Sequence, residues 1–288
     1  MSDVTPAAGS HYLHALNGPE VPLTKAEFDE LKQSRSILTD ALAFEQKFEL
    51  LLANWLALEV AAVELGLRAK VESEVAWYEK GSEWFNVLNR HVMNLLTTTR
   101  TYVDQVKGDF KHLPITPSFG EEAKARMAKA FDDNFHYRFM EGLRNVAQHG
   151  RLPVHNVGGS HGKRHWAESL SFHANRSELE GNRNFRAGTL KETPGAVDLR
   201  VASRAYVSSL SEVHVDLRKL VKPHVENARL AFLVALKRYS KAMQVRSVAL
   251  RAYAPEARKE EPVLVMLDWD AVRAKLAAKN AHKVSIES

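Results

Sequence analysis

Residues 37–65, ILTDALAFEQKFELLLANWLALEVAAVEL, carry the clearest hydrophobic pattern in the chain. Apolar side chains recur there at alternating spacings of four and three residues, which places them on one face of an α-helix. The members of this stripe are Ile37, Ala41, Phe44, Phe48, Leu51, Trp55, Leu58, Ala62 and Leu65. Because the pattern continues for about eight turns, we predict one long helix. A short helix should precede it, opened by the capping box Thr24–Glu27.

Similar stripes predict three more helical regions, at 82–110, 118–146 and 199–253. Pro114 and Pro117 separate the first two of these regions, and Gly150 follows the second, where glycine commonly ends a helix. The pattern therefore predicts an all-α fold, a bundle of long antiparallel helices. Either all the stripes close within one chain, or some of their faces bury against a second subunit.

Residues 151–197 interrupt the helical pattern. Glycines and prolines punctuate short segments there, and residues 166–173 alternate loosely between apolar and polar. We therefore expect a small irregular or β-hairpin insert. The predicted organisation is a flexible leader at 1–23, a helical domain at 24–260 that contains the insert, and a C-terminal strand and helix at 261–288.

Composition excludes several kinds of protein. The 288 residues include no cysteine, so disulfides, thiolate zinc sites and cysteine nucleophiles are absent. The first lysine is Lys25, and the apolar stretch 50–67 contains Asn54, Glu59 and Glu64. The former argues against a signal peptide and the latter against a membrane span. We expect a soluble, cytoplasmic protein that does not bind membranes.

Positive charge concentrates in one part of the chain. The net charge is +5, which mildly favours an anionic partner. Between residues 144 and 186, three acids (Glu168, Glu178 and Glu180) accompany the basic residues Arg144, Arg151, Lys163, Arg164, Arg176, Arg183 and Arg186.

The end of the 118–146 helix carries a row of polar side chains that could take part in catalysis. Asn145 and His149 are four residues apart and share a helix face, which Arg138 and Glu141 extend toward the N-terminus. Arg144 adjoins Asn145, so its long side chain can reach the same edge. Since His149 falls in the last turn, we expect the helix dipole to raise its pKa.

These groups suit the cleavage of a phosphodiester. A guanidinium binds phosphate in a bidentate manner and neutralises the charge that builds in the transition state. A histidine that titrates near neutrality can take a proton from a ribose 2′-hydroxyl or give one to the leaving 5′-oxygen. No metal or other cofactor is needed, because the RNA supplies its own nucleophile.

The segment Arg144-Asn145-Val-Ala-Gln-His149-Gly150, followed by Leu152-Pro153, resembles the Arg-polar-x-x-x-His signature of the HEPN superfamily. Many members of that superfamily are metal-independent endoribonucleases of toxin–antitoxin and phage-defence systems, and they usually dimerise. The resemblance implies that Arg144 binds the scissile phosphate, that Asn145 orients it, and that His149 is the acid/base or phosphate-binding group. It also implies a homodimer, with an antitoxin or another defence protein as a partner.

The same residues allow a structural interpretation. Arg144 could pair with Glu141 three residues earlier, and His149 could donate a hydrogen bond to the last helix carbonyls. In that case the protein would be a HEPN-like helical scaffold without activity, which binds RNA or a protein partner.

Beyond the motif, the insert offers candidate RNA contacts. Arg151, Lys163, Arg164 and Arg176 would bind phosphates, and the interleaved aromatics Trp166, Phe172 and Phe185 could stack on bases or pack onto the bundle.

The histidines of the insert do not form the pattern of a metal site. The histidines in question are His155, His161, His165 and His173. They lack the tight pairing and the completing carboxylate or cysteine of a zinc site.

Overall fold

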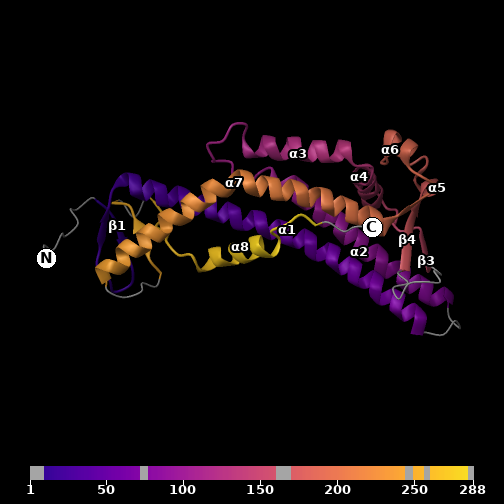
Figure 1. The fold of residues 1–288 in the computed structure, drawn as a ribbon, viewed down its shortest axis with the longest axis horizontal. Coiled ribbons are helices and arrows are strands. Elements are labelled where there is room, and N and C mark those ends of the chain that lie inside the picture. The colour runs from indigo at the N-terminus through magenta and orange to yellow at the C-terminus, as the bar shows by residue number, and fades with distance from the viewer. Residues whose placement is uncertain (1–9, 72–76, 160–169, 244–248, 256–259, 285–288) are drawn as a thin grey trace. The chain divides into compact units, whose positions relative to one another are not determined.

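The computed structural model describes residues 10–71, 77–159, 170–243, 249–255 and 260–284, and it is mainly helical (Figure 1). The helices within these ranges are α1 (Lys25–Val71), α2 (Trp77–Val106), α3 (Phe119–Asp133), α4 (Phe135–Gln148), α5 (Arg176–Leu179), α6 (Ala187–Glu192), α7 (Leu199–Met243) and α8 (Asp268–Lys279). The strands are β1 (His11–His14), β2 (Val21–Leu23), β3 (Asn156–Gly159), β4 (Leu170–Asn175), β5 (Ala196–Asp198), β6 (Arg251–Tyr253) and β7 (Val263–Leu264). The predicted mostly helical fold with a small β insert is confirmed.

The chain forms two compact units. Unit 1 comprises residues 1–46, 109–119 and 217–281, and unit 2 comprises residues 47–108, 120–216 and 282–288. Both α1 and α7 contribute to each unit, since each helix passes through a unit boundary.

Helix α1 follows the predicted stripe closely. The capping box is formed, because the backbone N–H of Thr24 donates to Glu27 Oε2 (2.7 Å) and the Glu27 N–H donates to Thr24 Oγ1 (3.2 Å). Phe48, Leu51 and Ala62 are fully buried. The prediction of two successive helices was wrong, however. Nothing in the sequence between the capping box and the stripe breaks the helix, so a single 47-residue helix forms.

Several other helix boundaries differ from the prediction. The region 118–146 is divided at Asn134, whose backbone is extended and whose side chain accepts from the Tyr137 N–H to cap α4. Helix α2 begins at Trp77 and passes through Gly81. Helix α7 ends at Met243, and residues 251–253, which the sequence placed in the same helical region, form β6 instead.

Unit 1 contains an antiparallel sheet with the strand order β2-β1-β6-β7. Tyr12 pairs with Tyr253 across β1 and β6, and their rings stack with centroids 5.2 Å apart. The sequence predicts a flexible leader over residues 1–23. In the structure, residues 11–14 and 21–23 of this segment form strands instead. They are ordered because Leu13, fully buried, anchors β1.

Unit 2 contains the second sheet, which lies in the predicted insert and has the order β3-β4-β5. Along β4, Leu170, Phe172 and Ala174 are buried while the intervening residues are half-buried. This alternation is the period-two pattern expected of a strand with one face on the core. In chain order, the three strands of this sheet fall between α4 and α7.

Within the described residues, α1 is long and apolar enough by composition to cross a membrane. This is weak evidence, because core helices of soluble proteins meet the same criterion.

Candidate functional site

Helix α4 carries the motif and ends where the sequence predicted. His149 is its C-cap residue, and Gly150 follows with a φ of +101°, a conformation that favours glycine. His149 is exposed, and among the described residues its imidazole has no hydrogen-bond partner. The imidazole is therefore accessible to a ligand.

A glycine fixes the position of α4 against the insert. A Cβ at Gly142 would lie 2.8 Å from the ring of Phe185, closer than real Cβ atoms approach. Phe185 is buried and also packs edge-on against Phe139, with centroids 5.7 Å apart. The absence of a side chain at Gly142 lets the insert dock directly on the motif helix.

Arg144 lies along the last turn of α4. Its Nη2 donates to Asn145 Oδ1 (2.6 Å) and its Nη1 donates to Gln148 Oε1 (3.0 Å). Its Nε is buried and lies 3.6 Å from Glu141 Oε2, outside hydrogen-bond distance. The two terminal nitrogens of Arg144 thus bind neutral amides. Its Nε makes a loose ion pair with Glu141 but no hydrogen bond.

Glu141 is held from the far side by a tyrosine. Tyr206 on α7 is fully buried, and its hydroxyl donates to Glu141 Oε1. Burial, followed by the charge of Glu141, raises the pKa of Tyr206 well above its ordinary value. The pKa of Tyr137, which packs edge-on against Tyr206, is raised by the same two causes. Both phenols stay protonated, so Tyr206 remains a donor that fixes Glu141.

Arg100 on α2 completes the surroundings of Glu141. Its Nη1 lies 3.9 Å from Glu141 Oε2, while its Nε lies 2.6 Å from Asp104. Arg144 and Arg100 together balance Glu141 and Asp104, so these four side chains carry no net charge.

Arg138 does not join this group, although the sequence placed it on the same edge. Its guanidinium donates to the carbonyls of Phe131 and Asp132 near the end of α3 and to Glu192 on α6 (2.7 Å). Arg138 therefore ties three helices together.

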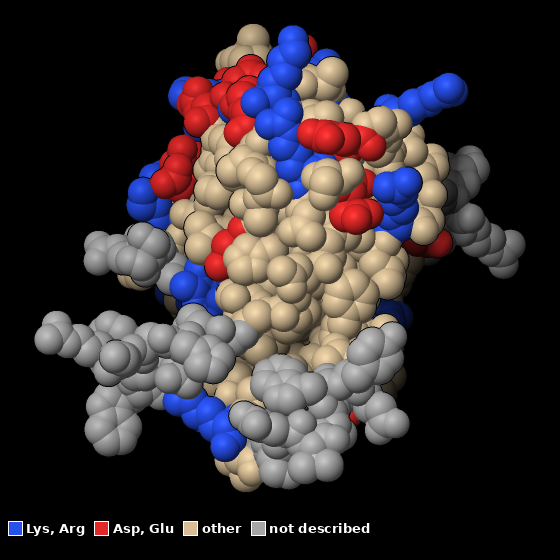
Figure 2. Space-filling model, turned by 90° about the vertical axis from the view of Figure 1, so that its right-hand side faces the viewer, with Lys and Arg blue, Asp and Glu red and all other residues tan. Residues whose placement is uncertain are grey.

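The proposed RNA-binding arginines make contacts within unit 2. Arg151 Nη1 donates to the Glu178 carbonyl (2.7 Å), and Arg176 donates to Glu180 (3.0 Å) and to the Thr193 carbonyl. Figure 2 views the side on which α5, α6 and the β3-β4-β5 sheet lie, and basic side chains alternate there with acidic ones. Lys163 and Arg164 lie outside the described residues.

The aromatic residues of the insert do not form a stacking surface. Phe172 is fully buried and Phe185 is 4% exposed, so both belong to the core. Trp166 is outside the ranges that the structure describes. The sequence left open whether these aromatics stack on RNA bases or pack onto the bundle. Phe172 and Phe185 pack onto the bundle.

His155 has a structural role. Its Nδ1 accepts a hydrogen bond from the Asn175 N–H (2.9 Å), which connects it to the end of β4. Burial lowers the pKa of His155, partly opposed by the charge of Glu178. Within the described part of the chain, no three His, Asp or Glu side chains are placed to hold a metal ion. His161 and His165 fall outside that part.

Comparison with protein-family models, with curated proteins and with solved structures gives no match. The likeness to the HEPN superfamily rests on the motif alone.

Sequence reasoning missed Gln148 and Tyr206 as parts of the site. Gln148 is four residues after Arg144, and this helical spacing could have identified it. Tyr206 belongs to the stripe of a distant helix, 65 residues from Glu141, and no local signal marks it.

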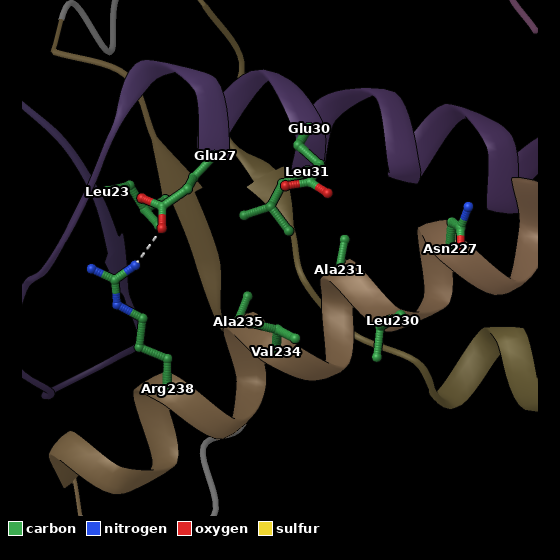
Figure 3. A pocket seen from close by; sticks show the side chains of 10 residues that line it. All are labelled: Leu23, Glu27, Glu30, Leu31, Asn227, Leu230, Ala231, Val234, Ala235 and Arg238. Atoms are coloured by element: carbon green, nitrogen blue, oxygen red, sulfur yellow. Dashed lines mark hydrogen bonds and ion pairs between the residues drawn. The ribbon is translucent and has the colours of Figure 1, made fainter.

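A groove in unit 1 contains none of the motif residues. It has a volume of about 370 Å³ and lies between α1 and α7 (Figure 3). Leu31 and Val234 are among its apolar lining residues, and the ion pair between Glu27 and Arg238 (2.7 Å) stands at one end. Its apolar lining and single ion pair do not suggest phosphodiester chemistry, so the end of α4 remains the best candidate site.

Proposed function

We propose that this protein is a metal-independent HEPN-type endoribonuclease that cleaves single-stranded RNA. The observation that carries the proposal is the arrangement at the end of α4. The terminal nitrogens of Arg144 donate to the neutral amides of Asn145 and Gln148, and the exposed imidazole of His149 follows at the C-cap of the same helix. A charged donor and an accessible acid/base group on one helix end are the two elements that this reaction requires.

In the proposed reaction the ribose 2′-oxygen attacks the adjacent phosphorus. The 2′-hydroxyl gives its proton to a base, the new O2′–P bond forms, and the P–O5′ bond breaks. The 5′-oxygen takes a proton from an acid and leaves, so the products are a 2′,3′-cyclic phosphate and a 5′-hydroxyl. His149 supplies one of the two proton transfers.

Arg144 would bind the phosphate by exchanging neutral partners for a charged one. Its terminal nitrogens donate to the amides of Asn145 and Gln148, and a phosphate oxygen is a stronger acceptor than either amide. Glu141 would hold the side chain in place during this exchange, and Asn145 would orient the phosphate.

The reaction also suggests a homodimer, because one His149 per chain provides one of the two proton-transfer groups. A two-fold arrangement would supply the second. We further propose that the enzyme acts in the cytoplasm as a toxin or phage-defence effector, with an antitoxin or another defence protein as its partner.

The decisive experiment is RNA cleavage in excess EDTA. The wild-type protein should cut single-stranded RNA, leave a 2′,3′-cyclic phosphate, and fail on 2′-O-methyl RNA. His149→Ala and Arg144→Ala should each lose about a hundredfold or more in rate. Arg144→Lys should not restore full activity, because lysine lacks the planar fork.

Matched controls come from exposed residues elsewhere. His112→Ala and Arg183→Ala should keep wild-type rates, since both side chains are exposed and lie outside the motif. His155→Ala is unsuitable as a control because His155 holds the end of β4. Cleavage that persists in both Arg144→Ala and His149→Ala, or that requires a divalent metal, would contradict the assignment.

A second candidate is a non-catalytic scaffold that binds RNA or a protein. The observation that favours it is the burial of Arg144, whose side chain is 13% exposed and lies beside Glu141. On this hypothesis the wild type binds single-stranded RNA without cutting it, and Arg144→Ala lowers the melting temperature more than Arg183→Ala does.

A further inference from the structure

The C-terminal half of α1 is apolar on two opposite faces. Its inner face is buried in unit 2 through residues such as Leu58 and Ala62. The opposite face is exposed and carries no charged residue. We call this face the outer stripe; it comprises Ala53, Leu56, Val60, Val63, Leu67 and Val71.

The outer stripe is unusually apolar for a protein surface. The exposed fractions are 58% for Leu56, 55% for Val60, 47% for Val63 and 58% for Leu67. Together these side chains present on the order of several hundred Å² of continuous apolar area, which is typical of an interaction site. A helix that is apolar on all sides is normally buried on all sides. A partner therefore should cover this face.

The spacing of the stripe fits a second helix. Its members follow one another at intervals of three and four residues, the pattern of a coiled-coil seam. In addition, the order Leu56, Val60, Val63, Leu67 reads the same in both directions. A two-fold interface uses the same patch on both copies, and a palindromic stripe matches itself when the copy is antiparallel.

We propose that the outer stripe is a homodimer interface in which α1 of two copies packs antiparallel around a two-fold axis between Val60 and Val63. Leu56 of one copy packs on Leu67 of the other, and Val60 packs on Val63. The seam forms the core of an interface that needs about 800 Å² from each copy. This proposal does not rest on ribonuclease activity, since the surface is apolar whether or not the protein cuts RNA.

Charge favours the antiparallel orientation. Arg68 and Lys70 lie in the last turn of α1. A parallel pair would bring these basic ends together, whereas an antiparallel pair places them beside the uncharged residues near Ala53. Antiparallel helix dipoles also attract each other.

The flanks of the stripe argue against a lipid surface as its partner. Helices that lie on membranes are bordered by lysine and arginine. The border of the outer stripe carries both signs, since Glu64 and Arg68 form an ion pair with each other at 2.6 Å, so it is not the basic border of a membrane-bound helix.

The first test is the mass of the full-length protein by light scattering, from about 1 to 100 µM. The wild type should be a dimer, and Val60→Glu with Val63→Glu should give a monomer with unchanged circular dichroism and a melting temperature that no longer depends on protein concentration. Val272→Glu is the matched control, because Val272 is 47% exposed on α8, like Val63 on α1. This control should stay dimeric.

The second test determines orientation, and the lack of cysteine makes it unambiguous. In the antiparallel pair, residue 56 lies opposite residue 67 of the partner and about 16 Å along the axis from residue 56 of the partner. A disulfide needs Cα atoms within about 7 Å. Leu56→Cys and Leu67→Cys should therefore each remain uncrosslinked alone and form a disulfide dimer when the two variants are mixed and oxidised.

Four outcomes would overturn the proposal. A monomeric wild type at every concentration would exclude the dimer, and a dimer that survives Val60→Glu with Val63→Glu would place the interface elsewhere. Self-linking of Leu56→Cys alone would show a parallel pair. Flotation of the wild type, but not of the double glutamate variant, with vesicles of phosphatidylcholine alone or of phosphatidylcholine mixed with phosphatidylserine would assign the stripe to lipid. RNA cleavage decides none of these outcomes.

Discussion

Two carboxylates of unit 2 are equally buried but are bound differently. The side chain of Glu59 is 13% exposed and that of Glu141 is 14% exposed. Glu59 accepts three hydrogen bonds from Arg200 and Arg204, at 2.7 to 2.9 Å. Glu141 accepts its hydrogen bond from Tyr206, and Arg144 remains 3.6 Å away.

This difference separates a structural ion cluster from a candidate site. At Glu59 both arginines donate directly to the carboxylate, which balances one of their two positive charges. At Glu141 the arginine keeps an unbonded Nε and places its terminal nitrogens on neutral amides next to His149. An anion can replace the neutral amides as the acceptor for the terminal nitrogens of Arg144, whereas a guanidinium that donates to a buried carboxylate stabilises the fold.

The largest effect on stability should come from breaking the Glu59 cluster. Glu59→Gln removes the charge that two arginines share and turns an amide donor toward them, so it should lower the free energy of unfolding by about 2–3 kcal/mol. Glu141→Gln keeps an acceptor for Tyr206 and should cost about 1 kcal/mol. Urea denaturation of the two variants measures the difference.

The two glutamine variants should also differ in RNA cleavage. Glu141→Gln should lower RNA cleavage through a misplaced Arg144, while Glu59→Gln should leave cleavage of the folded protein unchanged. Equal losses of stability in both variants, with equal effects on cleavage, would remove the distinction between the two clusters.

A smaller effect is the pH dependence of the Glu59 contribution. Burial raises the pKa of Glu59, but the hydrogen bonds from Arg204 and Arg200 outweigh burial and hold it below its ordinary value. Since the folded pKa is lower than the unfolded one, the stabilisation is complete above the unfolded pKa, about 4.3. It is lost as the pH falls through the folded value.

Melting temperatures measured from pH 7 down to pH 3 check this sign. The difference in melting temperature between the wild type and Glu59→Gln should become smaller as the pH falls, because protonated glutamic acid resembles glutamine. A gap that stays constant or widens toward acid would show that the ion cluster does not provide the stabilisation.

The smallest effect should follow from Tyr206→Phe, which removes the donor to Glu141. We expect about 1 kcal/mol or less of destabilisation and a fall in the rate constant for cleavage with little change in RNA affinity. Tyr239→Phe is the control in unit 1, because Tyr239 is also fully buried and its hydroxyl donates to the Pro19 carbonyl (3.0 Å). It should lose stability and keep the cleavage rate of the folded protein; a similar fall in that rate would argue that Tyr206 has no specific role.

The sequence by itself determined the features that a few neighbouring residues encode. The stripe from Ala41 to Leu65 lies on the core, Thr24 and Glu27 cap α1, and Gly150 ends α4. Each follows from helical periodicity or from the backbone preference of one residue, and both act over a single turn. The motif from Arg144 to His149 could be found for the same reason.

Only the tertiary structure decided which distant segments meet. Tyr12 pairs with Tyr253, Tyr206 binds Glu141, and Phe185 fills the space at Gly142. Apolar residues in separate stripes attract one another without selecting a partner, because hydrophobic burial is non-directional. The partner is selected by the close packing of the whole core. This packing leaves Arg144 3.6 Å from Glu141, whereas Arg204 donates two hydrogen bonds to Glu59.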